Sequence, residues 1–217
     1  MRPGANPILN LRPPEKVSGS QQKSTLSLIQ KLNTSHLESR DYDDSLAARV
    51  RSYELAYRMQ TAAPDIVDLR GESESTKKLY GIGEEPTDEF GTRCLLARRM
   101  IERGVRFVQL YSGGTIGWDA HNDVKENHTR YCAKTDKPVA GLIKDLKLRG
   151  LLDDTLVIWG GEFGRTPMAQ GNGRDHHIKG FSMWMAGGGI KGGVSHGATD
   201  ELGYNSVQDI VNVRDLH

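Results

Sequence analysis

The stretch Thr155–His177, TLVIWGGEFGRTPMAQGNGRDHH, most constrains what this chain can form. It begins with the apolar, β-branched run Thr155–Trp159, which is short enough to be a buried strand. Glycines follow, then Glu162, Arg165 and, after a Gly/Asn-rich loop, Asp175-His176-His177. Charged groups and imidazoles just past the C-terminal end of a buried strand lie where open α/β sheets bind their ligands. The alternative is a polar surface loop that carries chance histidines.

Helical and strand patterns alternate around this stretch, as in a parallel α/β sheet. Residues 105–111 and 155–159 predict two strands, a helix over 123–149 connects them, and 181–186 predicts a third strand. Strand–helix–strand crossovers are right-handed, with parallel and often adjacent strands. The C-terminal ends of the first two strands should therefore open at one edge of the sheet, with the loops that follow them facing each other.

The first part of the chain differs in character from the rest. Residues 1–85 predict proline-punctuated loops and short helices, without a convergent set of ligand side chains. We therefore expect 1–85 to be a helical, loop-rich N-terminal part of one domain and 86–217 to form its α/β core. Both termini resemble cuts inside a larger protein, because Met1–Pro14 lacks a leader pattern and Val207–His217 stops as an element begins.

A helix is predicted from Pro86, which is followed by acidic residues, to Gly104. Apolar side chains at helical spacing should form its buried face: Phe90, Cys94, Ala97 and Ile101. Arginines lie close to these positions, and we expect them on the solvated face: Arg98, Arg99 and Arg103.

The composition argues against two classes of partner. Among 217 residues, 29 basic and 28 acidic side chains give a net charge of +1, which favours neither nucleic acid nor an anionic membrane. No apolar run reaches the length of a membrane span.

Residues of two loops suggest a metal site. Asp119 and His121 are close in sequence, so an extended backbone lets both side chains point at one centre. His176 or His177 can add a third ligand from the facing loop. One carboxylate and two imidazoles suit a divalent metal, with Zn²⁺ favoured and Ca²⁺ or Mn²⁺ as alternatives, and leave a position open for water or substrate. The simpler interpretation of Asp119 and His121 is a helix N-cap region beside a solvent-exposed histidine.

Further side chains near these loops have two interpretations each. Glu162 is a second carboxylate ligand or a helix-capping acid, and Asp175 is a ligand or a residue that orients a histidine. Arg165 and Arg174 grip an oxyanion bidentately or are ordinary surface arginines. Thr166 is the first candidate if a nucleophile lies within this chain.

Longer motifs resemble known families. The stretch LKLRGLLDDTLVIWGGEFGRTP resembles the sulfatase and alkaline-phosphatase superfamily, and GWDAH, GGEFGRTP, GRDHH, MAGGGIKGG and GATDELGY together resemble the DUF1501 family of sulfatase-like proteins. The resemblance implies an α/β fold, an alkaline-phosphatase-like three-layer sandwich with a mostly parallel sheet, incomplete at both ends. It also implies a metal-dependent hydrolase of sulfate or phosphate esters, small-molecule or glycan substrates, and an exported, periplasmic or extracellular location.

The resemblance can be carried over by position. Asp119 and His121 resemble the first-metal ligands of the superfamily, and His176 or His177 resembles its last metal histidine. Phe163 stands where the superfamily has a second-metal histidine, so the usual two-metal site is incomplete. The superfamily's nucleophile lies on N-terminal elements that this chain lacks, so the catalytic residues are unknown and the fragment itself is expected to be inactive. The alternative is a non-catalytic binding or export-associated protein that keeps the fold.

Overall fold

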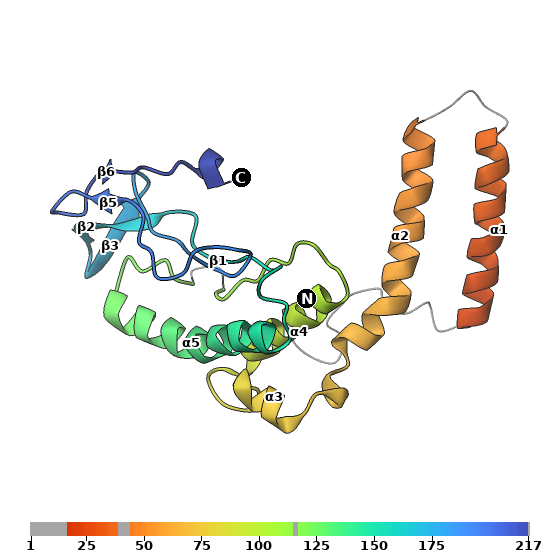
Figure 1. The fold of residues 1–217 in the computed structure, drawn as a ribbon, viewed down its shortest axis with the longest axis horizontal. Coiled ribbons are helices and arrows are strands. Elements are labelled where there is room, and N and C mark those ends of the chain that lie inside the picture. Colours follow the sequence, from red (N-terminus) through yellow and green to blue (C-terminus); the bar gives the residue numbers. More distant parts are fainter. Residues whose placement is uncertain (1–16, 39–43, 115–116, 217) are drawn as a thin grey trace. The chain divides into compact units, whose positions relative to one another are not determined.

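The computed structural model describes residues 17–38, 44–114 and 117–216 (Figure 1). The chain forms two compact units, Met1–Gly71 and Glu72–His217. Residues 72–85, which the sequence groups with the N-terminal part, belong to the second unit. The second unit therefore contains every residue of the predicted metal site.

The first unit contains long helices and one short 3₁₀ turn: α1 Gly19–Glu38, α2 Asp44–Val67 and η1 Leu69–Gly71. α1 and α2 run side by side, and Gln30 on α1 donates a hydrogen bond to Glu54 on α2 (Figure 1). Large apolar side chains remain exposed on both helices, among them Leu32 and Tyr53. No helix in the described ranges is both long and apolar enough to cross a membrane.

Three helices form the core of the second unit: α3 Glu74–Leu79, α4 Asp88–Glu102 and α5 Val124–Leu148. The chain at the end of α3 comes close to Gly91 on α4 and Gly141 on α5. Glycine is required at both positions, because a Cβ would lie closer than 3.0 Å to backbone atoms of Leu79 or Tyr80. The apolar core gathers where these helices meet: Tyr80, Phe90, Cys94, Leu95, Leu96, Ala97, Leu142 and Leu146.

The apolar face predicted for α4 is buried at Phe90, Cys94 and Ala97, but Arg98 is not on the solvated face. The Arg98 side chain is 2% exposed and forms part of the core. Its guanidinium donates to three carboxylates, at 2.6 to 2.9 Å: Glu72, Glu102 and Asp145. This ion network ties the start of the second unit to both of its long helices.

The strands follow α5 and form three two-stranded sheets among the described residues. Their bounds are β1 Val157–Trp159, β2 Gly164–Gln170, β3 Gly173–His177, β4 Trp184–Ala186, β5 Ala198–Thr199 and β6 Ser206–Gln208. β1 pairs with β4, β2 with β3 and β5 with β6, all antiparallel. A short 3₁₀ helix, η2 Val213–Leu216, comes last.

The predicted alkaline-phosphatase-like sandwich with a mostly parallel sheet is wrong, because each sheet in the described part of the chain is antiparallel and two-stranded. Residues 105–111, the predicted first strand, join none of these sheets, and Phe107 is 80% exposed. Of the strand predicted over 155–159, only Val157–Trp159 forms, as β1, and its partner is the antiparallel β4. Apolar, β-branched residues favour an extended backbone without specifying which segment pairs with it. The crossover rule fails here because it holds only for strands that share a sheet.

β2 and β3 form a hairpin where the sequence suggested a Gly/Asn-rich loop. Gln170 pairs with Gly173, which leaves Gly171 and Asn172 as a two-residue turn. Gly171 has a φ of 61°, which glycine adopts without strain, and two-residue turns with such a glycine match the twist of paired strands. The hairpin carries His176 near its end and so positions one of the predicted ligands.

Candidate metal centre

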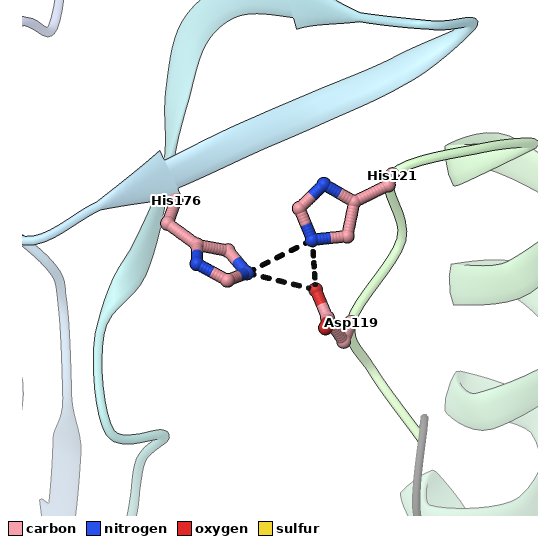
Figure 2. A group of neighbouring side chains, drawn as sticks. All are labelled: Asp119, His121 and His176. Atoms are coloured by element: carbon pink, nitrogen blue, oxygen red, sulfur yellow. Dashed lines mark hydrogen bonds and ion pairs between the residues drawn. The ribbon is translucent and has the colours of Figure 1, made fainter.

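Asp119, His121 and His176 converge on one point (Figure 2). Asp119 and His121 come from the loop before α5, and His176 comes from β3. His121 Nε2 lies 2.9 Å from Asp119 Oδ1, His176 Nε2 lies 3.1 Å from the same oxygen, and the two Nε2 atoms are 2.9 Å apart. Within the described ranges, no other cluster of His, Cys, Asp or Glu side chains has potential ligand atoms grouped in this way.

This triangle of ligand atoms has the size and chemistry of one face of a metal coordination sphere. Zn²⁺ bonds of about 2.0–2.1 Å at tetrahedral angles place neighbouring ligand atoms about 3.3 Å apart. The separations of 2.9 to 3.1 Å are only slightly shorter, so an ion just above the triangle can reach all three atoms. Two imidazoles and one carboxylate fit Zn²⁺ and leave a fourth position open, whereas Ca²⁺ takes at least six oxygen ligands.

Asp119 supplies negative charge at this centre. Burial alone would raise the pKa of its carboxyl group, but hydrogen bonds from Arg165 and His176, and the charge of Arg165, hold the pKa below its usual value. The carboxylate is therefore ionised at neutral pH, as a metal ligand must be. Arg165 also donates to the backbone carbonyl of Arg174 over 3.2 Å, so its guanidinium is held on two sides.

The hairpin tip is joined to the loop that carries the first two ligands. The backbone N–H of Arg174 donates to the carbonyl of Ala120 over 3.1 Å. The Asn172 side chain accepts from the backbone N–H of Asp123 over 2.8 Å and donates to the Asp123 carboxylate over 2.6 Å. These contacts fix the two segments against each other, and the third ligand reaches the other two as a result.

Gly173 lets the hairpin approach this loop closely. A Cβ at Gly173 would lie closer than 3.0 Å to backbone atoms of Ala120 and His121, and no flexible side chain is available there to move aside. Only glycine fits between the two backbones. The convergence of the ligand atoms therefore depends on a residue that ligates nothing itself.

His177 is engaged differently from its neighbour His176. Side chains alternate between the two faces of a strand, so consecutive histidines on β3 point in opposite directions. His177 is 5% exposed, its Nδ1 contacts the carbonyl of Gly180, and its Nε2 lies 2.8 Å from the carbonyl of Tyr204. Both ring nitrogens thus face backbone oxygens, and His177 links β3 to two later loops.

The other predicted site residues lie outside the triangle. Glu162 is exposed, and Asp175 accepts a hydrogen bond from the backbone N–H of His176 over 2.7 Å. Arg174 is also exposed, and its guanidinium donates to the carbonyl of Thr166 over 3.2 Å. The contacts of Asp175 and Arg174 therefore support the hairpin rather than the centre itself.

Two residues beside the ligands were not expected from the sequence. Gln170 Oε1 contacts His121 Nδ1, and Asn172 makes the contacts to Asp123 described above. A signal was present, because Gly-Asn between two short segments is a typical two-residue hairpin turn. A hairpin turn places the residues on its two sides opposite each other. The interpretation of this segment as an irregular loop does not predict that arrangement.

Comparison with known proteins gives one family match. No curated protein and no solved structure shows a significant match to the chain. A family model described as "Protein of unknown function (DUF1501)" matches residues 1–217, which include all the motifs that suggested this family. The chain therefore belongs to the DUF1501 family.

Proposed function

We propose that the chain binds a divalent metal ion, with Zn²⁺ favoured over Mn²⁺ and Ca²⁺, and that the site serves the hydrolysis of sulfate or phosphate esters. The observation that carries the proposal is the triangle of Asp119 Oδ1, His121 Nε2 and His176 Nε2, with sides of 2.9 to 3.1 Å. Three electron-rich atoms this close repel one another unless protons or a cation lie between them. The motif resemblance to sulfatase-like proteins supports an ester as substrate.

The residues around the triangle have separate tasks in this proposal. A bound divalent ion would polarise the ester and lower the pKa of a coordinated water. Asp119 would offset part of the ion's charge, and His121 and His176 would complete its set of protein ligands. Arg165, whose guanidinium contacts Asp119, is close enough to the centre to face an anionic ester there.

Water suits the role of attacking group better than Thr166 does. Thr166 is buried, and its hydroxyl donates to the carbonyl of Met168 over 3.2 Å. A nucleophile must instead be free to reach the ester beside the metal. This geometry therefore favours an attack by water or by a group from outside the described residues.

Phe163 favours a second candidate function, a non-catalytic protein that binds anionic esters. Its ring centroid lies 4.3 Å from that of His176, so an apolar ring covers one side of this ligand. Phenylalanine cannot ligate a second ion at that position. A single ion without a neighbouring nucleophile can hold an anionic ligand without turning it over.

The metal site can be tested by titrating the metal-free chain with Zn²⁺, Mn²⁺ and Ca²⁺ in a calorimeter, and with Co²⁺ by absorption spectroscopy. Asp119→Asn, His121→Ala and His176→Ala should each abolish stoichiometric Zn²⁺ binding. His196→Ala is the matched control, because His196 is an exposed histidine of the same unit outside the triangle. Unchanged Zn²⁺ binding in the triangle variants would exclude the proposed site.

The two candidate functions separate in a second experiment. The chain is loaded with each metal and assayed with aryl sulfates and aryl phosphates. Turnover that disappears in His121→Ala supports the hydrolase. Metal and oxyanion binding without turnover supports the non-catalytic candidate.

A further inference from the structure

We propose that Gln170 is a positioning residue that fixes the tautomer of His121, so that Nε2 of His121 is free of hydrogen and directed at Asp119 and His176. This inference rests on the proposed metal site. Gln170 is exposed and lies at the end of β2, across the hairpin turn from Gly173. Nothing in its sequence position marks it as a ligand, and its role follows from one contact.

That contact joins the side-chain oxygen of Gln170 to Nδ1 of His121. An amide oxygen can only accept, so Nδ1 of His121 must carry the hydrogen. In the neutral ring the other nitrogen, Nε2, then has a lone pair and no hydrogen. This is the nitrogen that lies 2.9 Å from Asp119 Oδ1 and 2.9 Å from His176 Nε2. The acceptor at Nδ1, the side-chain oxygen of Gln170, therefore leaves Nε2 of His121 free to bind a metal ion.

The backbone of Gln170 is held in place relative to His121. Gln170 pairs with Gly173 in the hairpin, and Asn172 in the turn exchanges two hydrogen bonds with Asp123. The turn thus holds Gln170 in place relative to the loop that carries His121. A residue held in this way can set ring orientation as well as tautomer, as partners of metal-bound histidines commonly do.

His176 has different supports. Its ring centroid lies 4.6 Å from that of His121 and 4.3 Å from that of Phe163, so neighbouring rings restrict its orientation. The amide acceptor is therefore specific to His121, and a change at Gln170 should act on one of the two imidazoles only. An effect confined to His121 would therefore distinguish the proposed role of Gln170 from a general loss of structure, which would affect both histidines.

The test uses Gln170→Leu, which removes the acceptor, and Gln170→Glu, which keeps it and adds negative charge. Gln109→Leu is the matched control, because Gln109 is an exposed glutamine of the same unit outside the site. Long-range ¹H–¹⁵N NMR spectra report which ring nitrogen of His121 carries hydrogen, and calorimetry reports Zn²⁺ affinity. Circular dichroism checks that each variant is folded.

We expect Nδ1–H at His121 in the wild type, in Gln170→Glu and in Gln109→Leu. In Gln170→Leu the hydrogen should shift to Nε2, which faces the Asp119 carboxylate. Zn²⁺ affinity should fall about tenfold in Gln170→Leu, the lower end of the range for such partners, since water can replace an exposed acceptor. Gln170→Glu should bind at least as tightly as the wild type. The same tautomer in Gln170→Leu and in the wild type would overturn the inference, whether or not Zn²⁺ binds. Failure of every protein, wild type included, to bind Zn²⁺ would instead overturn the proposed function, and the tautomer comparison would still decide the role of Gln170.

Discussion

Arg98 Nε donates to Asp145 Oδ2 over 2.9 Å, and neither side chain is more than 7% exposed. The same guanidinium donates to Glu72 over 2.7 Å, so one arginine satisfies two buried carboxylates from distant parts of the sequence. Tyr80 adds a hydroxyl that donates to Asp145 over 2.8 Å. The helical core of the unit that contains the candidate metal site is therefore held together by charged contacts as well as by apolar contacts.

Replacing Arg98 should lower the free energy of unfolding more than replacing a solvent-exposed arginine does. Arg98→Met keeps much of the side-chain volume but leaves the carboxylates of Glu72 and Asp145 buried with fewer partners. We expect the free energy of unfolding to fall by about 3–5 kcal/mol, measured by urea denaturation. Arg103→Met, at the exposed end of α4, is the control and should change it by less than about 0.5 kcal/mol. Equal effects of the two substitutions would contradict a structural role for the Arg98 network.

The Glu72 carboxylate should make folding stability depend on acid pH. Burial alone would raise its pKa, but hydrogen bonds and charges from Arg98 and Arg99 hold the pKa below its usual value. A pKa that is lower in the folded state gives stability that is complete above the unfolded value, about 4.3, and is lost as pH falls through the lower folded pKa. Denaturation curves recorded between pH 6 and pH 2.5 should show this loss, and Glu72→Gln should flatten it. A Glu72→Gln curve with the same pH dependence as the wild type would argue against this assignment.

Part of this structure could be predicted from sequence, and the failures have physical causes. Helical spacing located α4 and α5 correctly, since their periodic apolar residues depend on local geometry. Arg98 was misassigned because its partners, Glu72 and Asp145, are far away in sequence, and a charged residue alone is usually solvated.

The pairing of the strands could not be predicted from sequence for a similar reason. The run at 155–159 marks an extended segment, but pairing with Trp184–Ala186 depends on hydrogen bonds to a distant backbone. The ligand loop was easier, because Asp119 and His121 are close in sequence. Whether His176 or His177 lies beside Asp119 and His121 depends on which face of β3 each side chain occupies. An irregular loop has no such alternation of faces, so the loop interpretation left both histidines possible.

Gly173 should be essential to the metal centre even though it has no side chain. In Gly173→Ala the new Cβ would collide with the backbone of Ala120 and His121, so the hairpin must move away and carry His176 with it. We expect Zn²⁺ affinity to fall by more than about tenfold, since ligand positions tolerate only small displacements. Gly192→Ala is the control, because a Cβ there meets no atom within 4 Å. Calorimetry of both variants checks this, and normal Zn²⁺ binding by Gly173→Ala would show that the close approach is dispensable.

Substitutions should distinguish the roles of the two consecutive histidines of β3. His176→Ala removes a ligand atom, so we expect Zn²⁺ affinity to fall by more than about 100-fold, since changes in the outer partners of ligands alone cost 10–100-fold. His177→Ala removes buried contacts to the carbonyls of Gly180 and Tyr204, so it should lower the free energy of unfolding by about 1–3 kcal/mol. Its Zn²⁺ affinity, measured by calorimetry where the variant is folded, should stay within about threefold of the wild type, the change expected when no ligand or outer partner is lost. Each variant thus serves as the control for the other. The reverse result, with His177→Ala losing the metal and His176→Ala keeping it, would mean that the strand presents its opposite face to the centre.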